Sequence, residues 1–177
     1  MVKTNSSKNP IILNPIGAVK CEEEKQKFWI EIQKEFRPAL KELEHFTHCH
    51  IIWWANKNDT PELRKVLVSE ELPPFYGEDA PSMGVFANRS EYRPNPIAMT
   101  ICPILSIDIE QGTITVPWMD AFAGTPVVDI KPYLPMADLV KSADYPDYLQ
   151  HWPKSVEDSM KWWAEMENQD YSHISKP

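Results

Sequence analysis

The sequence predicts a mainly β protein, a small single-domain β-barrel of roughly seven strands with short peripheral helices and a C-terminal helix. Seventeen prolines against five glycines favour short strands and rigid turns over long helices. Thr47–Ala55 (THCHIIWWA) has β-branched and aromatic residues, no proline and a continuous apolar centre, which is typical of a buried strand. Thr113–Val116 alternates between polar and apolar residues, as the half-solvated arm of a hairpin does.

The early elements follow from local patterns. Ile11–Val19 reads as a first strand, broken by Pro15, with Ile16–Val19 its paired part. Residues 28–46 allow two interpretations, because period-two alternation from Phe28 indicates a strand while a helical stripe is also present. We predict a strand and then a short helix with Pro38 in its first turn, where the missing N–H is no loss.

Later strands are predicted at residues 63–68, 83–88, 97–107 and 113–117. Residues 70–82 contain three prolines and form a long irregular loop, a type of segment that often closes over or lines a binding site. A helix is expected to begin at Ser155, which is followed by Asp158 at capping-box spacing.

The expected organisation is a polar tail at residues 1–10, a barrel domain at 11–138 and an extension at 139–177 that belongs to the same unit. The N-terminus lacks the apolar region of a signal peptide, and no apolar run approaches membrane-spanning length. The three cysteines are scattered, without a C-x-x-C pair, which argues against a disulfide framework or a zinc site. These features favour the cytoplasm and no membrane association.

The net charge of −8 and the pI of about 5.1 bear on the partners of the protein. Proteins that grip a phosphate backbone usually present a basic surface, because counterion release supplies much of their affinity. Any contact with nucleic acid therefore requires a local basic patch in an acidic surround, which argues against an RNA substrate unless such a patch exists.

Two stretches carry polar residues on proline-stiffened backbones, and the hairpin predicted between them brings them together. They are GVFANRSEYRPNPIAM at residues 84–99 and DAFAGTPVVDIKPYLP at residues 120–135. Such backbones lose little entropy when a ligand binds. The polar candidates in these stretches are Arg89, Arg93, Asn95, Asp120, Asp129, Lys131 and Tyr133.

Both stretches resemble the signatures of the TrmO-like (TsaA-like) S-adenosylmethionine-dependent methyltransferase family, and a weaker likeness brings the match to residues 14–138. The resemblance implies a small β-barrel, a homodimer and S-adenosylmethionine as cofactor. The best-known activity of the family is N6-methylation of N6-threonylcarbamoyladenosine at position 37 of tRNA. Longer members add a C-terminal domain, which we expect this chain to lack.

The resemblance also implies positions for cofactor contacts. They correspond to Asn56, Lys57, Arg89, Met99, Asp120, Ala121, Phe122 and Ala123. Arg89 suits the cofactor carboxylate, and Asp120 suits its amino group, its ribose diol or its positive sulfur. Three departures from the family pattern stand out: Lys20–Glu24 lacks a P-R-Q-like element, Ala98 replaces a glycine, and Ala123 replaces an acid.

Methyl transfer depends mainly on alignment, and a general base is required only if the acceptor must lose a proton early. Candidates for that base are Asp129, Tyr133 and His48, and substrate-binding candidates are Arg93, Asn95, Lys131 and Tyr133. His45, His48 and His50 cluster in the sequence, yet no carboxylate or cysteine joins them at ligand spacing, so no metal site is predicted.

Structural roles compete with each functional one. Arg89 and Arg93 also suit surface ion pairs with Glu91 or Asp120, Asn95 suits a turn, and Asp129 suits an ion pair with Lys131. The alternative functions are a methyltransferase for a small molecule, a non-catalytic S-adenosylmethionine or nucleotide-binding module, and, last, an aromatic platform for carbohydrate.

Overall fold

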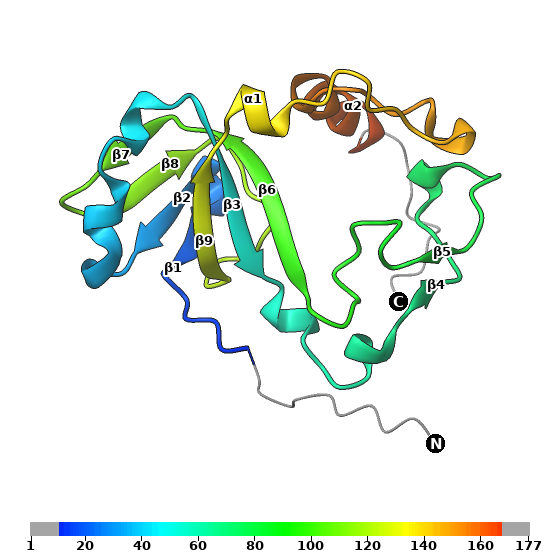
Figure 1. The fold of residues 1–177 in the computed structure, drawn as a ribbon, viewed down its shortest axis with the longest axis horizontal. Coiled ribbons are helices and arrows are strands. Elements are labelled where there is room, and N and C mark those ends of the chain that lie inside the picture. The colour runs from blue at the N-terminus through cyan, green and yellow to red at the C-terminus, as the bar shows by residue number, and fades with distance from the viewer. Residues whose placement is uncertain (1–10, 168–177) are drawn as a thin grey trace. The chain divides into compact units, whose positions relative to one another are not determined.

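The computed structural model describes residues 11–167, so the predicted tail at 1–10 lies outside the described residues. The chain divides into two compact units (Figure 1). In the described range, the first unit consists of residues 11–65 and 91–133, and the second of residues 66–90 and 134–167. The first predicted motif, residues 84–99, is therefore shared between the units.

The first unit is a seven-stranded antiparallel sheet with the order β6-β3-β9-β1-β2-β8-β7 (Figure 1). Its strands are β1 (Gly17–Glu22), β2 (Lys27–Ile32), β3 (His48–Trp54), β6 (Ile97–Pro103), β7 (Ser106–Asp108), β8 (Thr113–Val116) and β9 (Pro126–Pro132). Its short 3-10 helices are η1 (Glu23–Lys25), η2 (Lys34–Leu40), η3 (Leu43–His45), η4 (Asn56–Asn58) and η5 (Leu63–Lys65).

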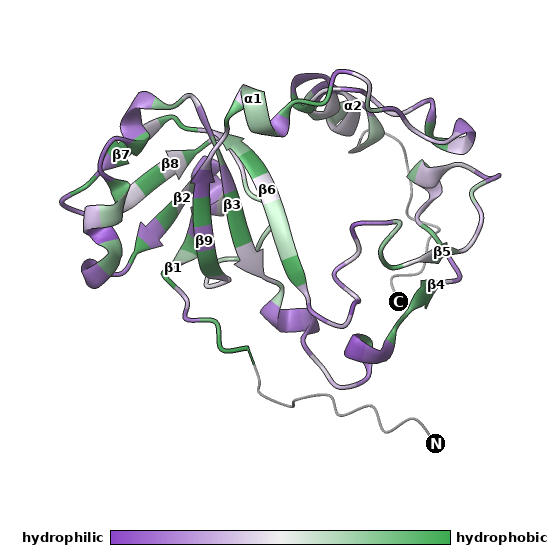
Figure 2. Ribbon diagram, in the orientation of Figure 1, coloured by the Kyte–Doolittle hydropathy of each residue, from purple (hydrophilic) through white to green (hydrophobic). Residues whose placement is uncertain are grey.

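The core of this unit lies on one face of the sheet. Side chains alternate along each strand, so Cys49 and Ile51 of β3 lie on the same face as Ile30 of β2 and Val127 of β9, and all four are fully buried. Figure 2 shows the corresponding hydrophobic bands along the strands. The prediction of a mainly β fold is confirmed, and the 47–55 run is the buried strand it indicated.

The predicted barrel is not supported, because the sheet is open. β6 and β7 stand at opposite ends of the strand order, and neither is hydrogen-bonded to the other. The physical reason is that they are successive parts of one extended run: Ile104 and Leu105 join them, β6 pairs with β3, and β7 pairs with β8. A covalent connection, and not a hydrogen-bonded ladder, thus joins the two ends of the sheet.

Three local predictions also need correction. Residues 63–68 do not form a strand, since η5 occupies 63–65 and β4 (Val68–Ser69) is two residues long. The predicted strand at 83–88 shrinks to β5 (Met83–Gly84), which pairs with β4. The helix after β2 exists, but it is a 3-10 helix, and Pro38 lies in its interior and not in its first turn.

The second unit contains β4, β5, η6 (Pro74–Tyr76), α1 (Pro135–Asp138), η7 (Asp147–Leu149) and α2 (Val156–Glu167). Aromatic rings hold it together, with Phe75 within 5.0–6.3 Å of the rings of Trp152, Trp162 and Trp163. These tryptophans are thus used in packing, which leaves little for a carbohydrate platform.

The predicted helix at Ser155 is present as α2. Ser155 Oγ accepts a hydrogen bond of 3.0 Å from the Asp158 N–H and donates one of 2.8 Å to the Asp158 carboxylate, which closes the first turn. Among the described helices, none has the length and apolar character needed to cross a membrane.

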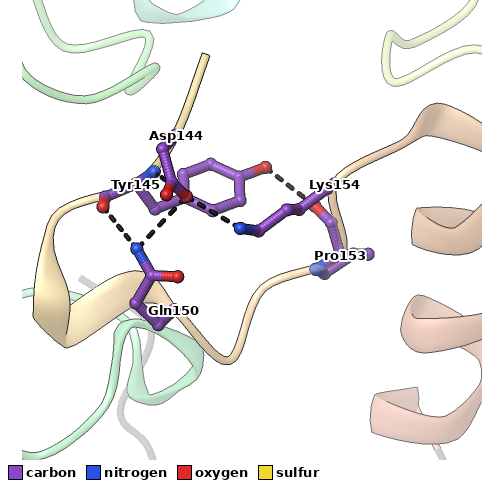
Figure 3. A network of polar contacts seen from close by, with 5 residues as sticks. All are labelled: Asp144, Tyr145, Gln150, Pro153 and Lys154. Carbon is purple, nitrogen blue, oxygen red and sulfur yellow. Dashed lines mark hydrogen bonds and ion pairs between the residues drawn. The ribbon is translucent and has the colours of Figure 1, made fainter. Parts of the chain in front are cut away.

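A polar network fixes the segment between α1 and α2 (Figure 3). The Asp144 carboxylate accepts hydrogen bonds from Lys154 Nζ at 2.8 Å, the Tyr145 N–H at 2.8 Å and Gln150 Nε2 at 3.2 Å. These donors, Lys154 foremost, lower the pKa of Asp144 to about 2. Tyr145 in turn donates its hydroxyl to the Pro153 carbonyl at 2.7 Å.

Candidate functional site

Three adjacent strands of the first unit, β6, β3 and β9, carry several of the predicted site residues on the face opposite the core. Ile52 of β3 pairs with Met99 of β6 on one side and with Asp129 of β9 on the other. Because directly paired residues project to the same face, Met99 and Asp129 share this outer face. Met99 is 41% exposed there, whereas its neighbour Thr100 points to the core and is buried.

Asp129 and Lys131 form an ion pair on this face, with Lys131 Nζ 2.7 Å from Asp129 Oδ2. The hydrogen bond and charge of Asp129 raise the pKa of Lys131. Asp129 Oδ1 also accepts the Ile130 N–H at 2.9 Å. Both carboxylate oxygens are therefore engaged, which makes Asp129 a weaker candidate for a general base and a better one for positioning Lys131.

His48, His50 and Tyr133 form a ring cluster beside that ion pair. The Tyr133 ring lies 5.5 Å from the His50 ring and 6.4 Å from the His48 ring, and the Tyr133 N–H donates to the His48 carbonyl at 3.0 Å. His48 Nδ1 is hydrogen-bonded to Thr47 Oγ1 at 2.9 Å. A search of the described residues finds no group of three histidine, cysteine or acidic side chains able to hold a metal ion.

The turn after β3 carries Asn56 and Lys57, and several contacts fix it. The Ala55 N–H donates to the Pro96 carbonyl at 2.8 Å, and the Asn58 N–H donates to the Ala55 carbonyl at 3.0 Å. Asn58 Nδ2 also donates to Glu91 Oε1 at 3.0 Å. The turn is thereby tied to both ends of the segment that leads into β6.

Asp59 anchors the other end of the same turn. Its carboxylate accepts hydrogen bonds from Trp54 Nε1, at 2.9 Å, and from Arg64 Nε. Arg64 also lies over the Trp54 ring, 5.4 Å from its centroid. Arg64 and then Trp54 lower the pKa of Asp59, so the anchor is ionised at neutral pH.

The loop from Asp120 to Gly124 holds the second group of predicted cofactor residues. Asp120 is exposed at the surface, and partial desolvation together with the nearby charge of Glu91 raises the pKa of its carboxyl. Ala121 packs against the core, while Phe122 and Ala123 are exposed. Gly124 adopts a φ of 86°, a conformation suited to glycine, and its N–H donates to the Val19 carbonyl of β1 at 2.8 Å.

The turn and the loop meet at one contact, since Lys57 Nζ lies 3.5 Å from the centroid of the Phe122 ring. The first unit therefore brings together two predicted cofactor segments that are distant in sequence. The β1–Gly124 bond also places the segment after β1 next to this loop, so the departure at Lys20–Glu24 adjoins the candidate site. In this chain Lys20–Glu22 end β1, and η1 begins at Glu23. Within β1, Lys20 Nζ forms an ion pair with Glu31 Oε2 at 3.1 Å.

The remaining predicted residues are placed differently. Arg89 lies in the second unit and is exposed. Arg93 is partly buried, and Asn95 is exposed, with its carbonyl accepting the Ile97 N–H at 2.7 Å in a tight turn before β6. Their roles in binding stay predictions. Glu91 Oε1 accepts its hydrogen bond from Asn58 Nδ2, and the predicted ion pairs of Arg89 and Arg93 stay predictions.

Sequence reasoning missed Asn58, Asp59 and Arg64 as residues that shape the site. Asp59 was recognised only as a turn residue, and nothing local in the sequence links Asn58 to Glu91. The signal available was the turn sequence NKNDT directly after the strongest predicted strand, because the ends of strands commonly carry functional turns.

The first unit is thus an open antiparallel sheet that carries the Asp129–Lys131 ion pair on its outer face and the Lys57–Phe122 contact between two of its loops. The family described as the tRNA-methyltransferase O N-terminal domain matches residues 14–139. The chain belongs to this family, which confirms the TrmO-like methyltransferase that the two motifs predicted.

Relatives of known name agree with that assignment. A probable S-adenosyl-L-methionine-binding protein of Pyrococcus horikoshii is 39% identical over 117 residues, covering 66% of this chain and 78% of that protein. An S-adenosyl-L-methionine-binding protein of Archaeoglobus fulgidus is 34% identical, covering 76% and 97%. The tRNA (adenine(37)-N6)-methyltransferase of Escherichia coli is 35% identical, covering 74% of this chain and 54% of the enzyme.

Solved structures agree as well. A crystal structure of TrmO from Pseudomonas aeruginosa has a TM-score of 0.58 and 27% identity, covering 78% of this chain and 62% of that chain. This chain therefore spans about half to two thirds of the length of the TrmO proteins to which it is similar. The names of the relatives accord with the predicted S-adenosylmethionine-dependent methyltransferase.

Proposed function

We propose that the protein is an S-adenosylmethionine-dependent methyltransferase that acts on tRNA, at the N6 nitrogen of N6-threonylcarbamoyladenosine 37. The observation that carries the proposal is the contact between Lys57 and Phe122, which joins the Asn56–Asn58 turn to the Asp120–Gly124 loop within the family-matched domain. These are the two segments in which the family resemblance expects most cofactor contacts.

The electrostatics of this region suit the proposed cofactor. Glu91 lies close enough for its charge to raise the pKa of Asp120, so two carboxylates face this region and favour a cationic ligand. When bound, S-adenosylmethionine supplies an electrophilic methyl group on a positive sulfur, together with an amino group. Asp120 is the residue to neutralise one of these charges, and the exposed guanidinium of Arg89 is the proposed partner of the cofactor carboxylate.

The outer face of β6, β3 and β9 is the proposed acceptor site. The rings of His48, His50 and Tyr133 offer flat surfaces on which a base taken out of its stack can lie. Lys131 supplies a positive charge for a phosphate or a carboxylate, and Asp129 holds it in place. Arg93 and Asn95, in the segment that leads into β6, are proposed to extend this surface.

Transfer to an exocyclic nitrogen requires loss of a proton as the new N–C bond forms. The three base candidates differ in their distance from the proposed cofactor site. His48 begins β3 and Tyr133 follows the end of β9, so both lie about 20 Å along the strands from the Asn56–Asn58 turn. Asp129, opposite Ile52, lies nearer to that turn, but both of its carboxylate oxygens are already bonded. We therefore assign no base and propose that His48 and Tyr133 hold the acceptor.

A second candidate function is methylation of a small molecule. The net charge of −8 favours it, because an acidic surface repels an RNA backbone. A non-catalytic S-adenosylmethionine or nucleotide-binding module is the third candidate, favoured by Ala123 and the departure at Lys20–Glu24.

The remaining proposals concern the assembly and location of the protein. We propose a homodimer, supported by the exposed apolar side chains of Leu105 and Ile109 on the first unit, and a location in the cytoplasm, where tRNA is modified. Residues 11–138 are proposed as the functional domain, with 139–177 as its extension. Gel filtration with light scattering tests the dimer directly.

The test of function uses methyl-labelled S-adenosylmethionine with two tRNA pools, one carrying threonylcarbamoyladenosine and one lacking it. We expect label in the modified nucleoside of the first pool alone, identified by mass spectrometry after digestion. His48→Gln should lower the rate at limiting tRNA concentration at least about tenfold, through weaker acceptor binding, with little change in cofactor affinity. His45→Gln is the matched control, because His45 is exposed and its nearest acid is Glu42, at 3.6 Å.

Three results would redirect the proposal. Label in neither pool, with cofactor binding intact, favours a small-molecule acceptor, to be sought among metabolites. Binding without turnover of any acceptor favours the non-catalytic module. Equal loss of rate in His48→Gln and His45→Gln would remove His48 from the mechanism.

A further inference from the structure

The ammonium group of Lys57 lies on the face of an exposed aromatic ring. Lys57 Nζ is 3.5 Å from the centroid of the Phe122 ring, well inside the range of a cation–π contact. The Phe122 side chain is 63% exposed, so the ring does not serve the core. Among the described residues, no carboxylate forms a salt bridge with Lys57, and the Phe122 ring is its cation–π partner.

The position of the ring does not depend on Lys57. The Phe122 carbonyl accepts the Thr125 N–H at 3.1 Å, and the Thr125 carbonyl accepts the Val19 N–H at 2.9 Å, so the loop is pinned to β1. The neighbouring Ala121 is anchored against the core. The backbone thus presents the Phe122 ring in a fixed place, and the flexible lysine side chain comes to it.

We propose that the face of Phe122 recognises the positive sulfur of S-adenosylmethionine, at the position where the structure holds the Lys57 ammonium group. Phe122 would then distinguish the cofactor from S-adenosylhomocysteine, its neutral product. The inference rests on the proposed function and assigns one part of the cofactor to one side chain. A ring that attracts one cation attracts another of similar size, since the contact depends on the ring quadrupole and the charge.

The cofactor and its product offer the same adenine, ribose and amino-acid groups, and differ at the sulfur alone. On transfer, the S–CH₃ bond breaks and its electron pair stays on sulfur, while the methyl group bonds to the acceptor, which loses a proton. The sulfur is then neutral and gains nothing from the ring. Lys57 competes for the same ring face, which favours release of the product.

The experiment is calorimetric titration of the full chain with S-adenosylmethionine and with S-adenosylhomocysteine, expressed as the ratio of the two affinities. In Phe122→Leu we expect the preference for the cofactor to fall at least about threefold. In Lys57→Met we expect the preference to rise, because a competing cation is removed. Phe46→Leu is the matched control, since Phe46 lies in the same unit away from the loop, is 36% exposed and should leave the ratio unchanged.

Each other outcome overturns the inference in a distinguishable way. If Phe122→Leu weakens both ligands equally, the ring covers a part that they share, such as adenine, while the proposed cofactor stands. If Lys57→Met leaves the ratio unchanged, the sulfur does not approach this ring. If the native chain binds neither ligand, the proposed function itself fails. Because Phe122 is exposed, its replacement should not unfold the protein, and circular dichroism checks this.

Discussion

Asn58 Nδ2 donates a hydrogen bond of 3.0 Å to Glu91 Oε1, joining the turn after β3 to the segment that precedes β6. Glu91 has a second effect, because its charge contributes to the raised pKa of Asp120. The Glu91 carboxylate therefore helps to hold the Asn56–Asn58 turn and also influences the protonation of Asp120 in the second predicted cofactor segment.

Replacing Glu91 by glutamine separates these two effects. Glu91→Gln keeps an acceptor for Asn58 and removes the charge, so the pKa of Asp120 should fall toward its usual value while partial desolvation still holds it above. S-adenosylmethionine affinity should decline as the pH falls through the pKa of Asp120, and in Glu91→Gln this decline should move to lower pH. Titration calorimetry at several pH values measures both curves, and coincident curves would contradict the coupling.

The Asp59 anchor should matter for affinity as well as for stability. Asp59→Ala leaves Trp54 Nε1 and Arg64 without their acceptor and frees the turn that carries Lys57. We expect a loss of about 1–3 kcal/mol in the free energy of unfolding and weaker S-adenosylmethionine binding. Asp59→Asn retains one acceptor oxygen and should lose less of both, as measured by urea unfolding and calorimetry. Equal behaviour of the two variants would show that the hydrogen bonds do not hold the turn.

Acid should loosen the second unit in a defined pH range. The pKa of Asp144 is lowered from 3.8 to about 2, with Lys154 as the main cause. A lowered carboxyl pKa gives stability that is present above the unfolded value and is lost as the pH falls from about 4 to about 2. NMR titration of the Asp144 carboxyl should give a midpoint near 2 in the native chain and a higher one in Lys154→Met. An unchanged midpoint would contradict the network of Figure 3.

Gly17 should tolerate no side chain, because β1 and β2 approach closely there. A Cβ at Gly17 would collide with the Glu31 carbonyl oxygen and lie 3.2 Å from Ile32 Cα, both backbone atoms that cannot move independently. Gly17→Ala should cost about 1–3 kcal/mol in the free energy of unfolding. Gly84→Ala is the control, since a Cβ at Gly84 would lie 3.8 Å from the Leu67 carbonyl oxygen, an ordinary van der Waals distance. Urea denaturation that gives equal stabilities would refute the close approach.

The cysteines should differ sharply in reactivity. Cys49 and Cys102 are buried opposite each other on β3 and β6, and burial raises the pKa of their thiols to about 11 and about 12. At pH 8 the thiolate form of each is about one part in a thousand or less. We expect a thiol reagent to modify Cys21 alone in the native chain and all three cysteines in urea. Fast labelling of Cys49 by mass spectrometry would show that the core opens readily.

Much of the sheet could be predicted from local patterns. The apolar run at 47–55, the alternation at 113–116 and the helix beginning after Ser155 each depend on neighbours in sequence, and each is present. Closure of the sheet was not predictable in this way. It depends on whether the strands at the two ends of the sheet, β6 and β7, form hydrogen bonds with each other. No local pattern in the 97–107 run determines that.

The candidate site shows the same division. The alternation of Asp129, Lys131 and Tyr133 along a strand predicted a shared face and an ion pair, and both are present. The bond between Asn58 and Glu91 depends on the register of β3 against β6, where Trp54 pairs with Ile97, and sequence spacing does not specify that register. Long-range polar contacts of this kind are the part that required the structure.

The central claim is that Asp120 and its loop bind S-adenosylmethionine, and the most direct test is calorimetric titration of the native chain, Asp120→Asn and Glu35→Gln. Glu35 is an exposed acid in η2, so its variant removes the same charge outside the two loops of the site. We expect binding that Asp120→Asn weakens at least about tenfold, or about 1.4 kcal/mol, and that Glu35→Gln leaves unchanged. No binding by the native chain, or equal binding by all three proteins, would contradict the account.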